Sequence, residues 1–257
     1  MAKPFEIVRE FEVEVSPQEV WDAVTSGTAG WLWPMEYEPK EGGAGPYGST
    51  VTAWDPPHHF TSRAEFPEAA EGGEDAEGRE GGGPRQTLNQ LDHLIEPRQG
   101  GGSWVRYVHS GILVDDWDNQ YDGASKHTDF YLHTLRQYLL HYPGRRAVFS
   151  GADATGTAAG APDALEVAAR ALGLPGDAVE GDAVQVRLPG ADAPVDAVLD
   201  YRNGYFLGLR TPDAMYRVFG RNNFGATVGV TVHDFGPGAD AEGTGERWQH
   251  WLDGVYA

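Results

Sequence analysis

Two histidines and a tyrosine in neighbouring strand-like segments are the residues of this chain best suited to acid–base chemistry. His93 lies in the segment "LDHLIEP", and Tyr107 and His109 lie two positions apart in "WVRYVHSG". Side chains two positions apart share one face of a strand, and histidine is the side chain whose ordinary pKa lies nearest neutral pH. His93, His109 and Tyr107 are therefore the candidates for hydrogen bonding to a ligand or for catalysis as acid or base. The competing interpretation is that both histidines are buried, hydrogen-bonded structural residues.

Metal and cofactor chemistry has less support in the sequence. The chain has no cysteine, which excludes disulfides, a thiol nucleophile and thiolate metal sites. His58 and His59 are adjacent and point to opposite faces of a strand, and Asp129 with His133 supplies only two ligands. No phosphate-binding loop, dinucleotide-binding glycine motif, nucleophile elbow or zinc-protease motif is present. We predict no metal site and no cofactor.

One segment has the spacing of a calcium-binding loop. In "DNQYDGASKHTD", residues 118–129, acids stand at the first, fifth and twelfth positions and glycine at the sixth. Gln120 at the third position and Ser125 at the eighth depart from that pattern. The segment also falls at the start of a long amphipathic pattern over 118–142, in which apolar residues recur every three or four positions and which predicts a helix. Calcium binding is kept as the minor alternative.

Composition limits the partners. The 257 residues carry a net charge of −20, which argues against nucleic acid or an anionic membrane surface as a partner. No run of eighteen apolar residues is present, so no transmembrane helix is expected, and the first ten residues lack the apolar core of a signal peptide. We expect a cytoplasmic protein. A protein partner and any oligomeric state stay open.

The elements that must position the candidate residues follow from periodicity. Alternating residues at 5–15 predict a half-buried strand, and "SPQE" predicts a helix start in which Ser16 caps the helix, Pro17 opens it and Glu19 completes a capping box. Trp21 is expected to anchor this helix to the sheet. Further strands are predicted at 35–39, 49–54, 59–66, 87–96 and 103–113. The acid- and glycine-rich segment 67–85 is predicted to be a mobile insertion between two of them.

A second unit is expected after the first. The predicted domains are 1–148, an Ala/Gly/Thr-rich linker at 149–161, and a smaller α+β domain at 162–257. The segments "YVHSG" at 107–111 and "TVHDFG" at 231–236 are alike, and each precedes a closing aromatic helix. We interpret the second domain as a shortened second copy of the first fold.

The order of motifs in the first domain resembles a known superfamily. "SPQEVWDAVTSGTAGWLWP", "TAWDPPHHFTSRAEF", "LDHLIEP", "GGSWVRYVHSGIL" and "YLHTLRQYL" occur in register over about residues 3–143. Together they resemble the SRPBCC, or START-like, superfamily, and within it the family similar to the C-terminal domain of the activator of heat-shock protein 90 ATPase. No recognisable counterpart of that co-chaperone's N-terminal domain precedes residue 3.

This resemblance implies a helix-grip fold, an α+β arrangement in which a curved antiparallel sheet wraps a long C-terminal helix and encloses an apolar cavity. Alternate residues of the strands then face the cavity, and the resemblance also brings aromatic side chains to its wall. The implied ligand-binding residues are Trp31, Trp33, Phe60, Phe66, Leu91, His93, Ile95, Val105, Tyr107, His109, Phe130 and Tyr131.

Three classes of function are compatible with a fold that encloses such a cavity. The first is binding of a small hydrophobic or aromatic molecule with no intrinsic reaction. The second is an enzyme of the cyclase, dehydratase or hydrolase type that uses His93, His109 or Tyr107 as acid or base. The third is a co-chaperone-like module that binds protein partners through its surface. The first is preferred because no motif marks a nucleophile.

Overall fold

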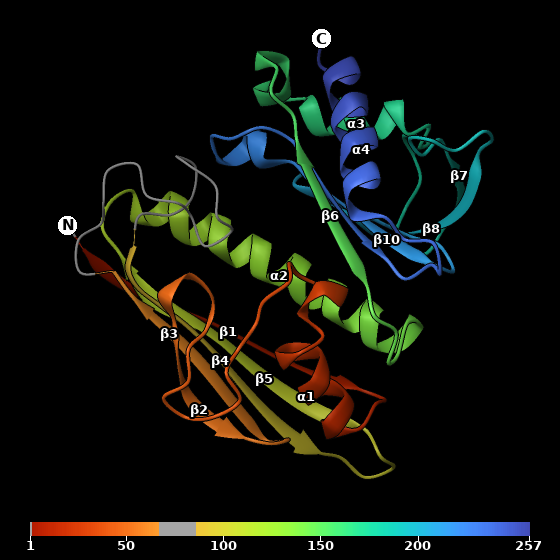
Figure 1. Ribbon diagram of the computed structural model, residues 1–257. Helices are drawn as coiled ribbons and strands as arrows, with labels where there is room; N and C mark the ends of the chain where they lie inside the picture. Colours follow the sequence, from red (N-terminus) through yellow and green to blue (C-terminus); the bar gives the residue numbers. More distant parts are fainter. Residues whose placement is uncertain (1, 67–85) are drawn as a thin grey trace. The chain divides into compact units, whose positions relative to one another are not determined.

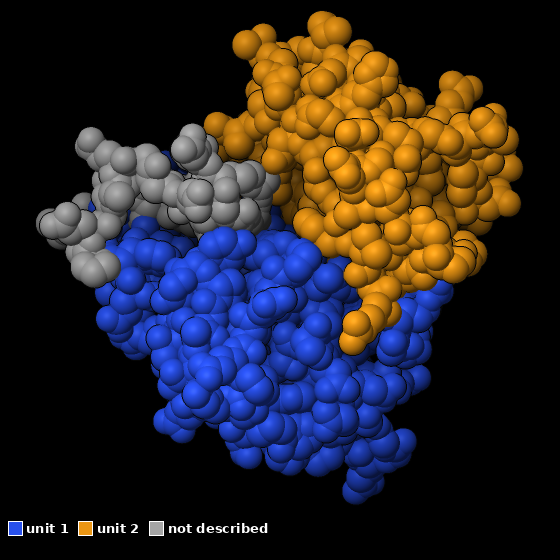
Figure 2. Space-filling model, in the orientation of Figure 1, with its two compact units in different colours: residues 1–145 blue, residues 146–257 orange. Residues whose placement is uncertain are grey.

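The computed structural model describes residues 2–66 and 86–257 and divides the chain into two compact units, 1–145 and 146–257 (Figures 1 and 2). The insertion predicted at 67–85 lies outside the described residues. Both units combine an antiparallel sheet with helices, so the predicted α+β class is confirmed. Among the described residues, no helix has the length and apolar character needed to cross a lipid bilayer.

Unit 1 is a five-stranded antiparallel sheet with two main helices. Its elements in chain order are β1 (Lys3–Val13), α1 (Pro17–Thr25), η1 (Thr28–Gly30), η2 (Pro46–Gly48), β2 (Thr50–Asp55), β3 (His59–Glu65), β4 (Gln86–Pro97), β5 (Ser103–Leu113) and α2 (Trp117–His141). The strand order is β1-β5-β4-β3-β2, so the first strand pairs with the last and the remaining strands follow as a meander. The strand predicted at 35–39 is wrong, because this segment runs as an irregular loop outside the sheet.

The start of α1 follows the predicted capping chemistry. The Ser16 hydroxyl accepts a hydrogen bond from the Glu19 backbone N–H at 3.3 Å, and the Glu19 carboxylate accepts one from the Ser16 N–H at 2.9 Å. On the buried face of α1, the Trp21 ring makes edge contacts with Trp54 of β2 at 4.9 Å and Phe60 of β3 at 6.2 Å. Trp21 therefore anchors α1 to the sheet, as expected.

Helix α2 lies across one face of the unit 1 sheet (Figure 1). Arg9 of β1 identifies this face, because its guanidinium donates to Asp129 at 2.5 Å and to Ser125 at 2.9 Å, both on α2. Phe11, two positions further along β1, lies under the Arg136 guanidinium of α2 at 5.9 Å. We call the face of a sheet that lies against its long closing helix the inner face.

Unit 2 has a six-stranded antiparallel sheet. Its elements are β6 (Val148–Asp153), η3 (Thr157–Gly160), α3 (Ala164–Ala171), β7 (Ala183–Val186), β8 (Val195–Arg202), β9 (Phe206–Arg210), β10 (Ala214–Phe219), η4 (Arg221–Phe224), β11 (Gly229–Asp234) and α4 (Ala241–Val255). The linker predicted at 149–161 is wrong, because residues 149–153 belong to β6 and pair with β11. Their small residues suggested a linker, whereas the alternation that marks a strand extends over only six residues.

The two units share one topology. The strand order of unit 2 is β6-β11-β10-β9-β8-β7, so again the first strand pairs with the last and a meander follows. In both units a helix follows the first strand and a longer helix follows the last strand. Unit 2 has fewer residues than unit 1 but one strand more, so its sheet is not shortened.

The inner face of the unit 2 sheet is almost entirely apolar. Alternate residues of β8 to β11 belong to one buried cluster with α3 and α4, and Tyr216 contacts Trp248 of α4 at 5.8 Å between ring centroids. The strand residues of this face are Ala197, Leu199, Leu207, Leu209, Tyr216, Val218, Val230 and Val232. The Tyr256 hydroxyl, just beyond α4, donates to the Ala164 carbonyl of α3 at 2.7 Å and holds the two helices together.

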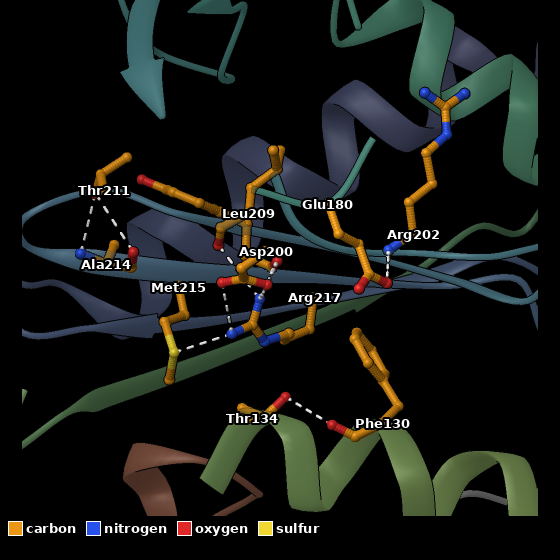
Figure 3. A network of polar contacts seen from close by, with 11 residues as sticks. Phe130, Thr134, Glu180, Asp200, Arg202, Leu209, Thr211, Ala214, Met215 and Arg217 are labelled. Carbon is orange, nitrogen blue, oxygen red and sulfur yellow. Dashed lines mark hydrogen bonds and ion pairs between the residues drawn. The ribbon is translucent and has the colours of Figure 1, made fainter. Parts of the chain in front are cut away.

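The opposite face of this sheet carries a buried ion pair. Arg217 of β10 donates to both carboxylate oxygens of Asp200 of β8, at 2.8 and 3.2 Å, and to the Met215 sulfur at 3.0 Å (Figure 3). The two charged side chains are 1% and 3% exposed. Gly208 of β9 lies between them, and a Cβ there would stand 2.3 Å from an Asp200 oxygen. A glycine is therefore required for the pair to form across β9.

Candidate functional site

The candidate site is a row of side chains that crosses the inner face of the unit 1 sheet. Strand register pairs Tyr107 of β5 with His93 of β4, His93 with Phe60 of β3, and Tyr107 with Arg9 of β1. Directly opposed residues of antiparallel strands lie on the same face. Because Arg9 reaches α2, the whole row faces α2 as well. The sequence predicted this arrangement for His93, Tyr107 and Phe60.

His93 is the unusual member of this row. The side chain is 3% exposed, and neither ring nitrogen has a hydrogen-bond partner among the described residues. Burial lowers the pKa of the imidazole to about 4, and the Asp92 charge and the neighbouring Phe60 backbone only partly offset that effect. The ring is therefore neutral at pH 7, with one N–H to donate and one lone pair to accept. Buried polar groups are almost always hydrogen-bonded in native proteins, so His93 stands out as a candidate functional group.

Aromatic rings surround His93. Phe60 stacks on the imidazole at 5.8 Å between centroids with the ring planes 24° apart, and Tyr107 contacts it at 5.0 Å. Tyr37, in the loop after η1, contacts Phe60 at 4.8 Å, and Trp54 contacts Phe60 at 5.7 Å. The arrangement places one neutral polar group in an otherwise aromatic environment, which is the composition of a small-molecule site.

The two tyrosines of this cluster are held in their neutral form. Burial raises the pKa of both the Tyr37 and the Tyr107 hydroxyl well above the usual range. The Tyr37 hydroxyl lies 3.3 Å from the Met35 sulfur. At pH 7 the side chains in contact with His93 and Phe60 therefore bring no charge to this part of the inner face.

His109 differs from His93 because it has a partner. Its Nε2 lies 2.8 Å from the Asn89 side-chain oxygen, and its ring contacts Phe5 edge-on at 5.0 Å. Burial lowers the pKa of this histidine to about 4 as well. The structural interpretation left open by the sequence therefore fits His109, whose Nε2 donates to Asn89, and does not fit His93.

The tryptophans of the loop after α1 have separate environments. The Trp31 indole N–H donates to the Ala23 carbonyl of α1 at 2.9 Å, so Trp31 fastens the loop to its own helix. The Trp33 ring contacts Tyr131 of α2 at 5.8 Å, and its indole nitrogen is buried without a hydrogen-bond partner among the described residues. Trp33 is thus a second unpartnered polar group of unit 1.

The remaining predicted residues are arranged as follows. Leu91 pairs with His109, and Ile95 pairs with Val105, so these side chains lie on the inner face with the row. Ile95 and Val105 are fully buried, whereas Leu91 is half-buried. Phe130 is fully buried on α2, and Phe66, just beyond β3, is half-buried. Strand pairing places these strand residues on one face of the sheet. The ring contacts with Phe60 and Tyr107 connect His93 directly to its neighbours.

On the outer face of the same sheet, ordinary polar pairs form. Asp92 accepts hydrogen bonds from Thr61 at 2.6 Å and from His59 at 2.9 Å, and Arg106 lies 3.6 Å from Glu10. Asp92 and Arg106 do not oppose each other across the strands, because Asp92 pairs with Val108 in the register. Each finds a partner on another strand.

The calcium-loop alternative is wrong. Residues 117–141 form one continuous helix, so 118–129 cannot fold around an ion as a loop. Asp122 pairs with Lys126 one turn along the helix, and Asp129 pairs with Arg9. In the described part of the chain, no group of three or more His, Asp or Glu side chains is placed to hold a metal ion.

Sequence analysis missed three contributors to the site: Tyr37, Trp54 and Asn89. Trp54 and Asn89 lie in strands at alternate positions from Phe60 and His93, so strand alternation could have indicated their face once that of Phe60 and His93 was assigned. Tyr37 lies in an irregular loop, and no local pattern indicates that it reaches Phe60.

Comparisons with known proteins give similarities to solved structures only. No family model matches the chain, and no curated protein matches it. Protein MLL2253 from Mesorhizobium loti is 18% identical over 52% of this chain and 96% of its own, with a TM-score of 0.42. The Aha1 dimer from Colwellia psychrerythraea is 14% identical over 52% of this chain and 96% of its own, with a TM-score of 0.35.

A third solved structure spans both units. DynU16, a protein of the dynemicin biosynthetic locus, is 14% identical over 98% of this chain and 95% of its own, with a TM-score of 0.41. These scores are too low to support a functional inference. The class of the protein follows from its own strand order: a helix-grip arrangement of an antiparallel sheet with a long closing helix.

Proposed function

We propose that unit 1 binds a small hydrophobic or aromatic molecule between the inner face of its sheet and α2, without catalysing a reaction. The observation that carries this proposal is His93, a buried neutral imidazole among aromatic rings, whose two nitrogens have no side-chain hydrogen-bond partner in the part of the chain that the structure describes. Leaving a buried polar group unpaired costs about 1–3 kcal/mol. A ligand that hydrogen-bonds to His93 would remove that cost and contribute apolar area to the aromatic cluster.

The proposal includes a family and a role for each unit. Unit 1 is proposed to belong to the SRPBCC, or START-like, superfamily, in the family similar to the C-terminal domain of the activator of heat-shock protein 90 ATPase. Unit 2 is proposed to be a second copy of the same fold, because the two units have the same strand order. Its apolar inner face makes it a structural copy and not a second binding unit.

Binding is favoured over catalysis by the pKa of His93. An efficient general base has a pKa near the pH at which it works, whereas burial holds His93 at about 4. At pH 7 this imidazole accepts a hydrogen bond but is a weak acceptor of a whole proton. Tyr107 beside it keeps its proton because burial raises its pKa. The pair is therefore suited to holding a polar group of a ligand in place.

The test is native mass spectrometry of the protein purified from its natural host, followed by solvent extraction of the bound material. We expect an adduct of small-molecule mass on the wild-type chain. The adduct should be lost in His93→Phe and kept in His250→Phe, a matched change at an exposed position of α4. A bare wild-type chain whose tryptophan fluorescence also responds to no aromatic probe would contradict the proposal.

A further inference from the structure

Strand β1 is an edge of the unit 1 sheet and pairs with β5 alone among the strands that the structure describes. It runs over eleven residues, Lys3–Val13. The other edge of this sheet, β2, is partly covered, because Val51 exchanges backbone hydrogen bonds with Gly42 and Gly43 at 2.8 Å. The edge strands of unit 2, β6 and β7, have six and four residues. A long open strand edge is a template for pairing with another chain.

Alternate residues of β1 direct their backbone groups away from β5. Pro4 has no N–H to give to the ladder, and its carbonyl accepts from the Trp117 indole at 3.1 Å. The Val8 carbonyl likewise accepts from the Arg9 guanidinium at 3.0 Å. The even-numbered residues are therefore the ones that face the open edge. In the part of the chain that the structure describes, the backbone N–H groups left without an acceptor on that side are those of Glu6, Val8, Glu10 and Glu12.

The charged side chains beside these groups are all acidic. Because Arg9 lies on the inner face, the even-numbered residues of β1 lie on the outer face, and Glu6, Glu10 and Glu12 are exposed there. Arg106 lies 3.6 Å from Glu10, and Arg98 lies 3.3 Å from Glu12. Glu6 has no ion-pair partner among the described residues. The open edge therefore has a negative outer side.

These charges disfavour a second copy of the chain as the occupant of the edge. Antiparallel pairing of two β1 strands about Val8 would place Glu6 of one copy opposite Glu10 of the other. Like charges directly opposite each other in a sheet are destabilising, whereas opposite charges contribute favourably. A basic strand is therefore the complementary partner.

We propose that β1 binds an extended basic segment of a protein partner by antiparallel β-strand addition. Main-chain hydrogen bonds with the open groups of β1 supply affinity. Lys or Arg at alternate positions, opposite Glu6, Glu10 and Glu12, supplies selectivity. The net charge of −20 adds attraction at longer range. This edge is separate from the row around His93, so the inference goes beyond the proposed function and does not depend on it.

A fluorescein-labelled peptide, Lys-Thr-Lys-Thr-Lys-Thr-Lys, tests the proposal by fluorescence anisotropy with the full chain. In antiparallel pairing, each lysine opposite an even-numbered residue exchanges backbone hydrogen bonds with it, and each threonine directs its N–H away from β1. Methylation of the lysine backbone nitrogens should therefore weaken binding at least about tenfold, because several hydrogen bonds are lost. Methylation of the threonine backbone nitrogens is the matched control and should change the affinity less than about twofold.

Variants of β1 locate the bound peptide. Val8→Pro removes the central open N–H and leaves the pairing with β5 intact, so we expect a loss of about two- to tenfold. Glu6→Gln with Glu10→Gln should weaken binding by a similar factor, and less at high salt. The control Glu242→Gln with Glu246→Gln, at exposed positions of α4, should change the affinity less than about twofold. Thermal unfolding checks that each variant is folded.

The methylated peptides test the wild-type chain, so the proposal stays falsifiable even if a variant does not fold. Absence of peptide binding to the folded wild-type chain would overturn it. Equal affinity for the two methylated peptides would also overturn it, because the attraction would then come from charge alone. Sedimentation velocity that shows a dimer of the wild-type chain, abolished by Val8→Pro, would mean that a second copy occupies the edge instead.

Discussion

The two units have the same strand order, but the inner faces of their sheets differ in composition. In unit 2 most strand residues of the inner face are aliphatic and form one apolar cluster with α3 and α4, and the buried polar Ser150 of β6 is satisfied by donating to the Ala241 carbonyl of α4. In unit 1 the corresponding face includes two histidines, an asparagine and two serines, and His93 on it has no side-chain hydrogen-bond partner among the described residues. The comparison teaches that this topology does not itself specify a binding site. The residues at alternate positions of the strands decide whether the long helix closes over an apolar core or over a face that carries polar side chains.

Unit 2 buries charged groups only as a pair. Arg217 of unit 2 is paired with Asp200 through two hydrogen bonds. We expect Arg217→Met to lower the free energy of unfolding by about 3–5 kcal/mol, because it leaves Asp200 buried without its partner. The double variant Arg217→Met with Asp200→Leu should recover most of that loss. Denaturant unfolding monitored by hydrogen exchange of unit 2 amides measures both, and equal losses in the two variants would show that the pair is not the cause.

A matched leucine pair compares the packing of the inner faces. Leu199 in unit 2 is fully buried, whereas Leu91 in unit 1 is half-buried. We expect Leu199→Ala to cost roughly 3–4 kcal/mol and Leu91→Ala about 1 kcal/mol, because less apolar area is lost. Chemical denaturation of each variant gives the numbers. Equal costs would mean that the inner face of unit 1 is packed as tightly as that of unit 2, and the proposed difference between the two faces would be wrong.

The dependence of stability on pH should reveal the burial of His93. The pKa of His93 is about 4 in the folded protein, against about 6.5 in the unfolded chain. Between these values the unfolded state binds a proton that the folded state does not, so the free energy of unfolding falls as the pH is lowered from about 6.5 to 4. The part due to His93 is about 3 kcal/mol.

His109, whose pKa is also lowered to about 4, acts in the same direction. The variant His93→Phe should therefore show a shallower fall of stability with acidity, but not a flat one. Urea unfolding at several pH values between 7 and 4 measures the slope. Identical slopes for the wild type and the variant would show that folding does not lower the pKa of His93.

The smallest expected effect is a gain in the stability of unit 1. At pH 7, His93→Phe removes a buried polar group that has no partner, and we expect unit 1 to become more stable by about 1 kcal/mol. The exposed control His250→Phe should change stability by less than about 0.5 kcal/mol. Thermal unfolding resolves the difference. A loss of stability in His93→Phe would indicate that the imidazole makes hydrogen bonds that stabilise the unliganded protein.

Local sequence chemistry predicted the elements of unit 1 well. Ser16 and Glu19 marked the start of α1, and three- and four-residue spacing marked α2 within one residue of its observed ends. The resemblance to the helix-grip pattern implied that His93, Tyr107 and Phe60 face the same side, and the strand register pairs them on one face. These features depend on neighbours in the chain, so one sequence is sufficient to find them.

Long-range contacts could not be found in the same way. Neither β6 nor β10 was predicted, because neither segment is marked by a clear polar–apolar alternation of its own and each is specified by its partner strands. The sequence left open whether His93 and His109 are hydrogen-bonded, since Asn89 lies on another strand. The lack of a partner for His93 depends on every residue around it, and only the folded arrangement shows this.

The pairing of the first strand with the last has a consequence for synthesis on the ribosome. Lys3 pairs with Leu113 and Val13 with Ser103, so β1 finds its partner only after about a hundred further residues have been made. At 5–20 residues per second, this is a wait of roughly 5–20 s. The hairpins β2–β3 and β4–β5 are closed by nearer residues and are expected to form first. We therefore expect β1 to join last, so that the site around His93 is completed only when the N-terminal strand closes the sheet.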